Sequence, residues 1–153
     1  MQKIFLILPL VLSFVIPRNY ERFINKNLRE AKAASYATGV PVSVLFSQAI
    51  IESGAGRSNI ARKTKNFFGL KCGDDWKGQS YNTSTGCYRS YSSIEESFLD
   101  YACFLNENYT GVVGKSYRYW SRYCRGYGGS SNYWNKVGAV IKIYDLDKYE
   151  IKW

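Results

Sequence analysis

Apolar residues recur at helical spacing over most of the chain. From Tyr20 to Thr38, apolar positions every three or four residues alternate with charged ones, as on a helix with one buried face. Gly39 ends this pattern, and Pro41 is well placed as the first residue of a second helix that Gly54 and its neighbours end. Further helices are predicted over 58–63, from a capping box at 92–95 to 105, over 117–123 and over 132–143.

The middle of the chain, from Asn66 to Tyr91, has a different character. It is rich in Gly, Asp, Asn, Ser and Thr, and short apolar residues alternate with polar ones around Trp76. Such a segment is typical of a loop or a small hairpin. We therefore predict a mainly α (α+β) protein, with one helical domain over 18–153 that contains a small polar insertion.

The first 17 residues are typical of an export signal. Lys3 precedes thirteen uncharged residues, Ile4 to Ile16, fewer than the about 20 that a membrane-spanning helix needs. The small-x-small cleavage pattern is absent before Arg18. We expect export to the periplasm, cell wall or extracellular space. The alternatives are an uncleaved membrane anchor and a buried first helix of the domain.

The composition excludes several kinds of chemistry. The 153 residues contain no histidine, which excludes Ser-His and Cys-His nucleophiles and His-ligated zinc. An enzyme without a cofactor must then take its acids and bases mainly from 12 carboxylates. The net charge of +9 suits an anionic partner, either a cell-wall polymer or a nucleic acid.

Four cysteines fit an exported protein, in which they are normally oxidised. Cys72, Cys87, Cys103 and Cys124 allow three pairings. We favour Cys72–Cys87, which closes a loop of about 15 residues and stabilises the fold by roughly 3 kcal/mol. Cys103–Cys124 follows by elimination; alternatively, Cys103 is a small buried apolar residue. No C-x-x-C spacing suggests a redox or zinc motif.

Glu52 is the carboxylate without an obvious structural role. It follows three apolar residues at the end of the second helix and precedes the small residues 53–56. Apolar surroundings disfavour the ionised form of a carboxyl group, as a general acid requires. The alternative is a solvent-facing helix end. Asp74 and Asp75, beside Trp76, are either turn residues or a second carboxylate across a cleft.

The other nine carboxylates have structural explanations. Glu95 and Glu96 belong to the capping box and the first turn of its helix, and Asp100 lies among polar neighbours on the later part of that helix. Glu150 belongs to a charged C-terminal tail. None of these is expected to carry chemistry.

The stretch from Tyr109 to Trp134 combines eight aromatic residues with Lys115 and three arginines. Such a surface can stack bases and bind phosphates, or it can stack sugar rings while the cations attract an anionic polymer. Core packing with solvated arginines is the third interpretation.

Several ordered motifs resemble one family. The segment S-Q-A-I-I-E-S-G-A-G-R-S at 47–58 resembles the catalytic-helix signature of glycoside hydrolase family 73, the endo-β-N-acetylglucosaminidases of peptidoglycan. In family order follow N-F-F-G-L-K at 66–71, W-K-G at 76–78, Y-R-S-Y at 88–91, S-I-E-E-S at 93–97 and G-Y-x4-N-Y at 126–133. The resemblance runs from about residue 20 to Glu150.

The resemblance implies a lysozyme-like helical fold with a small β-lobe and no cofactor or metal. Glu52 matches the family's general acid, and Tyr127 matches the tyrosine of the G-Y motif near the cleft. Cys72 and Cys87 fall where some relatives carry a pair that brackets the β-lobe. The residues expected to bind substrate or shape the cleft floor are Asn66, Phe68, Tyr91 and Tyr133.

One departure concerns the second carboxylate. Many relatives place a Glu or Asp shortly before the segment that matches Tyr88-Arg89, whereas 79–86 contains no acid. An inverting enzyme needs a base about 6.5–9.5 Å from the acid. Asp75 is the candidate substitute. Otherwise the N-acetyl group of the substrate acts as nucleophile and Glu52 alone supplies the proton, which is the route we favour.

The sequence therefore predicts an exported or virus-encoded peptidoglycan hydrolase that cuts β-1,4 bonds in the glycan strand. We expect it to be monomeric and to bind anionic cell-wall polymers as further partners. The alternatives are a lytic transglycosylase or muramidase on the same fold and an inactive wall-binding module. Binding to nucleic acid is not expected, because it explains the charge but not the E-S-G-x-G segment.

Overall fold

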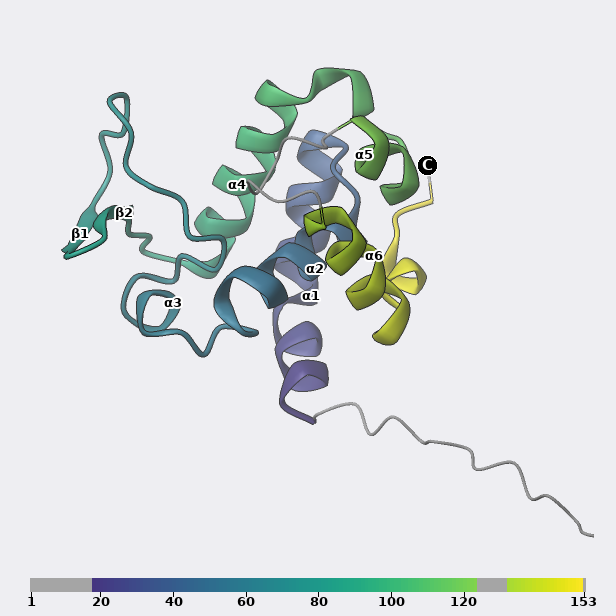
Figure 1. The fold of residues 1–153 in the computed structure, drawn as a ribbon, viewed down its shortest axis with the longest axis horizontal. Helices are drawn as coiled ribbons and strands as arrows, with labels where there is room; N and C mark the ends of the chain where they lie inside the picture. The colour runs from purple at the N-terminus through teal and green to yellow at the C-terminus, as the bar shows by residue number, and fades with distance from the viewer. Residues whose placement is uncertain (1–17, 124–131, 153) are drawn as a thin grey trace, which may run out of the picture.

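The computed structural model describes residues 18–123 and 132–152. Figure 1 shows the helices gathered into one body from which the hairpin projects to one side. This arrangement confirms the mainly helical fold with a small β-lobe. In chain order the elements are α1 (Arg18–Thr38), α2 (Val42–Ser53), α3 (Asn59–Thr64), β1 (Ser80–Thr83), β2 (Gly86–Arg89), α4 (Ile94–Asn108), the 3-10 turn η1 (Thr110–Val112), α5 (Tyr117–Tyr123), α6 (Tyr133–Ile143) and the 3-10 turn η3 (Leu146–Tyr149).

The helices meet in one apolar core around α2. Ten of the 12 residues of α2 are buried, so this helix is surrounded by α1, α6 and η3 rather than lying on the surface. Phe98 of α4 is fully buried and meets the rings of Phe46, Phe67 and Phe68 edge-on, with centroids 5.9, 6.1 and 5.2 Å apart. These ring contacts join α2, α4 and the loop after α3.

Local sequence signals place the helix boundaries with small shifts. Pro41 is the N-cap of α2, one residue before the helix begins. At the start of α4 the N-cap is Ser93, whose Oγ accepts from the Glu96 N–H at 3.1 Å, and Glu96 reaches back to the N–H of Ser92. The capping box therefore lies one residue later than predicted, with Glu96 in place of Glu95.

The β-lobe is an antiparallel hairpin of β1 and β2, in which Tyr81 pairs with Tyr88 and Asn82 with Cys87. The Cys72–Cys87 disulfide is formed, as predicted, across 15 residues. Next to the disulfide, the backbone of Lys71 forms an isolated antiparallel β-bridge with Tyr88. The lobe is thus joined covalently to the strand-like segment that precedes it.

Within the described ranges, none of the helices is both long and apolar enough to cross a bilayer. Residues 1–17, with the predicted export signal, lie outside the described residues.

Candidate active site

Glu52 is the penultimate residue of α2, and the chain turns away directly after it. Gly54 adopts the left-handed conformation (φ 59°, ψ 45°), which glycine accepts readily, and its N–H donates to the Ile50 carbonyl. The Ser53 hydroxyl accepts from the Gly56 N–H at 2.8 Å. No further helical turn covers Glu52, so it is exposed. The interpretation of a carboxylate held among apolar neighbours is therefore corrected: apolar residues surround its helix, and Glu52 itself faces solvent.

Tyr133 orients the Glu52 carboxylate. Its hydroxyl donates to Glu52 Oε1 at 2.7 Å, although the two residues are 81 positions apart. Tyr133 is only 6% exposed and begins α6, which packs on α2. The residue was predicted to bind substrate. In the structure its hydroxyl contacts the predicted acid.

Gln48 completes this chain of hydrogen bonds. It lies one helical turn before Glu52 on the same side of α2, is fully buried, and donates from Nε2 to the Tyr133 hydroxyl at 3.3 Å. Its Oε1 has no hydrogen-bond partner among the described residues. Gln48 belongs to the recognised motif, but its position there gave no indication of its contact with Tyr133.

The opposite end of α2 is capped from far along the chain. Pro41 has no side-chain cap. Instead, the Glu150 carboxylate accepts from the N–H of Val42 at 2.9 Å and from the N–H of Ser43 at 3.0 Å. A carboxylate at this position satisfies free N–H groups and complements the helix dipole. Glu150 was assigned to a charged tail, and a contact across 108 residues has no local signal.

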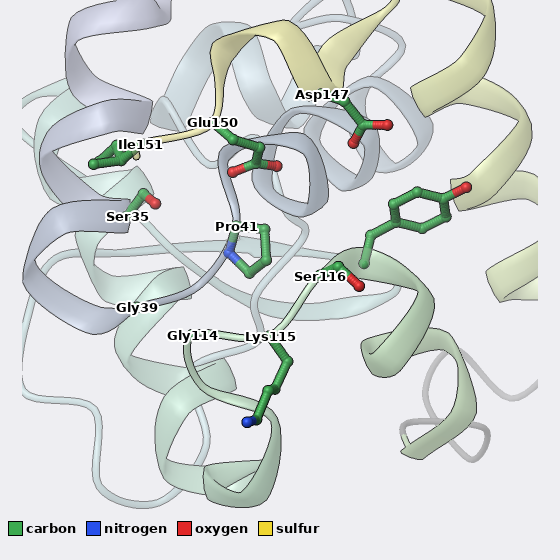
Figure 2. Close-up of a pocket in the computed structure, with 10 residues that line it drawn as sticks. Ser35, Gly39, Pro41, Gly114, Lys115, Ser116, Asp147, Glu150 and Ile151 are labelled. Carbon is green, nitrogen blue, oxygen red and sulfur yellow. The ribbon is translucent and has the colours of Figure 1, made fainter. Parts of the chain in front are cut away.

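Glu150 also lines a pocket of about 180 Å³ with Ser35, Gly39 and Lys115, between the start of α2 and the loop after η1 (Figure 2). Ten residues separate the start of α2 from Glu52, which is a distance of about 15 Å along a helix. This pocket is therefore a separate feature from the surroundings of the Glu52 carboxylate.

Asn66 connects the β-lobe to the helical body. Its Nδ2 donates to the carbonyls of Leu70 and Arg89, both at 2.9 Å, and its Oδ1 accepts from the Leu70 N–H at 3.0 Å. Asn66 is 1% exposed, and both amide donors are used. Phe68 is also buried and stacks on Tyr101 with centroids 4.0 Å apart. Both residues shape the structure around the site and present no polar group to solvent.

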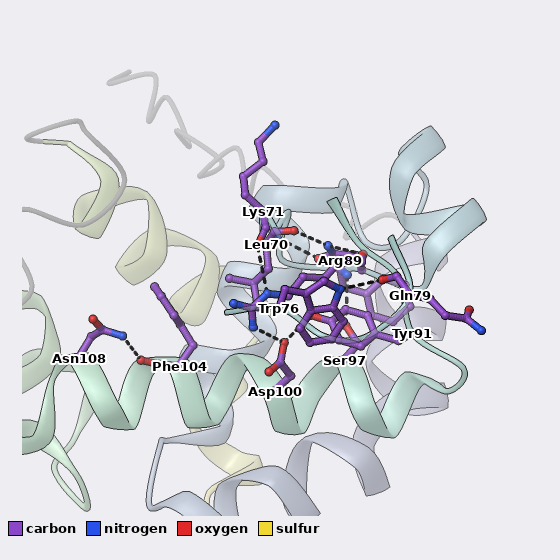
Figure 3. A network of polar contacts seen from close by, with 12 residues as sticks. Leu70, Lys71, Trp76, Gln79, Arg89, Tyr91, Ser97, Asp100, Phe104 and Asn108 are labelled. Atoms are coloured by element: carbon purple, nitrogen blue, oxygen red, sulfur yellow. Dashed lines mark hydrogen bonds and ion pairs between the residues drawn. The ribbon is translucent and has the colours of Figure 1, made fainter. Parts of the chain in front are cut away.

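Tyr91 belongs to a polar network that fastens the lobe to α4 (Figure 3). Its hydroxyl donates to Asp100 Oδ2 at 2.6 Å, and the same oxygen pairs with Arg89 at 2.8 Å. Burial, and then the bond to Asp100, raises the pKa of Tyr91 well above its usual value. Trp76 lies against Arg89, with the guanidinium 4.7 Å from the ring centroid. Asp100 was placed among polar neighbours on its helix and was not expected to carry chemistry, so the sequence analysis missed this network.

The remaining predicted residues stay apart from these contacts. Asp74 and Asp75 are exposed and make no hydrogen bond or ion pair with the other described residues. Tyr127 lies outside the described residues, and so does Cys124. Cys103 is a free cysteine among the described residues. Because its expected partner, Cys124, lies outside them, the Cys103–Cys124 bridge stays a prediction. Cys103 lies one turn from Leu99 and Asp100 on α4 and lines a pocket together with them and Trp76.

Over 18–123 and 132–152, no group of three or more acidic or cysteine side chains is arranged to hold a metal ion.

Comparison with known proteins identifies the family. Residues 28–146 match the glucosaminidase family, described as mannosyl-glycoprotein endo-beta-N-acetylglucosaminidase. The peptidoglycan hydrolase FlgJ of Vibrio parahaemolyticus is 34% identical over 103 residues, which are 58% of this chain and 33% of that protein. The exo-glucosaminidase LytG of Bacillus subtilis is 28% identical over 130 residues, 71% of this chain and 45% of that protein.

The fold agrees with solved structures. The glycoside hydrolase domain of Salmonella typhimurium FlgJ superposes with a TM-score of 0.71 at 27% identity, over 84% of this chain and 90% of that domain. The chain spans between a third and a half of the length of the two curated relatives. Because the family match covers well over half of the chain, the protein belongs to the glucosaminidase family, glycoside hydrolase family 73.

Proposed function

We propose that this protein is a peptidoglycan hydrolase that cleaves β-1,4 glycosidic bonds of the glycan strand as an endo-β-N-acetylglucosaminidase, with Glu52 as its general acid. The observation that carries the proposal is the exposed Glu52 carboxylate, which a buried tyrosine orients at the end of a buried helix. The names of the relatives supply the substrate, since one is a peptidoglycan hydrolase and another an exo-glucosaminidase.

The hydrogen bonds support different roles for the two oxygens of Glu52 in the proposed reaction. Gln48 donates to the Tyr133 oxygen, so the phenol proton points to Glu52 Oε1. Oε1 is thus an acceptor, so in the proposed reaction Oε2 is the oxygen that delivers the proton to the leaving group. Fixing one oxygen in this way holds the other in one orientation toward solvent, as positioned proton transfer requires.

The proposed reaction needs no second carboxylate if the N-acetyl group of the substrate acts as the nucleophile. The N-acetyl carbonyl oxygen attacks C1 while the bond from C1 to the leaving oxygen breaks and Glu52 Oε2 gives that oxygen its proton. Water then attacks C1 while the bond from C1 to the N-acetyl oxygen breaks, and the water gives a proton to the Glu52 carboxylate; two displacements at C1 give overall retention of configuration. The hairpin contains no acid, which favours this route. Asp75 as a base, and Tyr127 as a second cleft residue, remain predictions.

Export follows from the substrate. A protein that cleaves the wall must reach it, and residues 1–17 have the composition of an export signal. We propose that they direct export, with an uncleaved membrane anchor as the alternative. The domain would then occupy residues 18–153 and act on the wall without a cofactor.

The test is mass spectrometry of fragments released from purified peptidoglycan by the wild type, Glu52→Gln and Glu107→Gln. Glu107 is an exposed carboxylate on α4 and serves as the matched control. Fragments with a reducing N-acetylglucosamine end should appear with the wild type and the control and vanish with Glu52→Gln. Reducing N-acetylmuramic acid or anhydro ends would contradict the glucosaminidase assignment, and no fragments from a folded wild type would contradict hydrolysis.

A further inference from the structure

One face of the β-hairpin carries two half-buried tyrosines side by side. Tyr81 and Tyr88 are direct partners in the register of β1 and β2. Directly opposite residues of an antiparallel pair project to the same face. Arg89, on the next position, projects to the other face and reaches Asp100 on α4. The tyrosines therefore lie on the face of the hairpin that is not fastened to α4.

A lysine side chain contacts each of the two tyrosines. Lys63 of α3 donates to the Tyr81 hydroxyl at 2.9 Å, and Lys71 Nζ lies 3.5 Å from the centroid of the Tyr88 ring. Both lysines are exposed. The pKa of the Tyr88 phenol is lowered, chiefly by Lys71 and then by the Thr85 hydroxyl. The four residues Lys63, Lys71, Tyr81 and Tyr88 are called the lysine–tyrosine face below.

No carboxylate compensates this charge. Among the described residues, neither Lys63 nor Lys71 forms an ion pair. Between Glu52 and Asp74 the sequence contains no acid but has five basic residues. Much of the net charge of +9 is therefore concentrated in the segment that directly follows the proposed catalytic residue. Lysine ammonium groups with unused donors bind carboxylate and phosphate oxygens.

We propose that the lysine–tyrosine face binds oxyanion groups carried beside the sugar chain of the cell wall, and so holds the enzyme on its polymer. The inference rests on the proposed function for the nature of that polymer. Two sources supply the same chemistry: the carboxylates of the peptide stems and the phosphodiesters of polymers attached to the wall. Nothing in the face selects a base sequence, and its rings are covered by lysines rather than free to stack successive bases.

The experiment is co-sedimentation with purified wall sacculi in a Glu52→Gln background, so that binding is measured without cleavage. Lys63→Gln with Lys71→Gln is compared with Lys32→Gln with Lys142→Gln, two exposed lysines on α1 and α6 that give the same change in charge. Removing two exposed charge contacts should weaken binding about three- to tenfold and flatten its salt dependence. The control pair should bind like the parent.

Three further arms complete the test. Lys63→Arg with Lys71→Arg keeps both charges and should restore binding, which separates loss of charge from loss of folding. Sacculi stripped of phosphodiester polymers and sacculi stripped of stem peptides should identify which oxyanion is bound, because only one treatment should remove the difference between the variants. Equal binding by the two glutamine pairs, or a difference that survives both treatments, would overturn the proposal.

The result stays separate from that of the proposed function. If the wild type releases no fragments but the face variant still loses wall binding, the face is supported and hydrolysis is not. If fragments appear and the two glutamine pairs bind alike, hydrolysis is supported and the face is not.

Discussion

The helical body and the β-lobe are held together by different kinds of interaction. In the body, fully buried apolar side chains such as Phe46, Phe98 and Trp120 interlock. The hairpin of four plus four residues has no fully buried side chain, and it is held by a disulfide, an ion pair, and the amide of Asn66. A two-stranded hairpin is marginal by itself in water, so these contacts are what give the lobe a fixed position.

The difference affects the site directly. Glu52 lies where the apolar body ends, and its orientation comes from a body residue, Tyr133. The lysine–tyrosine face lies on α3, on the hairpin and on the segment with Lys71 that precedes the hairpin. Changes in the body should therefore affect folding and catalysis together, whereas changes in the lobe should affect the local order of the lobe before the fold of the body.

The largest expected effect comes from the body. Phe98→Ala removes a fully buried ring that touches three other aromatic rings, and should lower the free energy of unfolding by about 3–5 kcal/mol. Urea unfolding followed by circular dichroism measures it. Leu99→Ala is the control, because Leu99 is the next residue and is 40% exposed; its loss should be well below 1.5 kcal/mol, on the order of a surface substitution. Equal losses would contradict the described core.

An intermediate effect is expected from the disulfide. Replacing Cys72 and Cys87 by serine should cost the lobe roughly 3 kcal/mol, because the loop between them is no longer closed. Hydrogen exchange should then quicken over 70–91 and much less over α2. Cys103→Ser leaves the bridge intact and should change neither region. Equal loss of protection in α2 would mean that lobe and body unfold as one unit.

The smallest effect should come from Tyr91 and depends on pH. Its pKa is raised in the folded protein, so its stabilisation is complete below the unfolded value of about 10 and is lost as pH rises above it. The free energy of unfolding should therefore fall as the pH rises above about 10. Tyr91→Phe should cost about 1 kcal/mol at neutral pH and make this fall shallower.

Asp100→Asn provides the matched comparison. Because Asp100 is the second cause of the raised pKa of Tyr91, after burial, the asparagine variant should keep part of the alkaline fall. If wild type and Tyr91→Phe lose stability in parallel above about pH 10, the network does not hold the phenol in its neutral form.

Local signals in the sequence determined much of this protein. Helical periodicity located the helix ends to within about three residues, and Gly54 predicted the turn that leaves Glu52 at a helix end. Loop length favoured the Cys72–Cys87 bridge, and ordered motifs indicated the family. These predictions were possible because each rests on residues that lie close together in the chain.

Only the tertiary structure decided the contacts between distant segments. Tyr133 meets Glu52 across 81 residues, and Glu150 caps α2 across 108. Asp100 pairs with Arg89 only because the lobe folds back onto α4. Spacing along the chain carries no information on such pairs: a carboxylate on a helix surface or in a tail looks solvated until packing brings a donor to it.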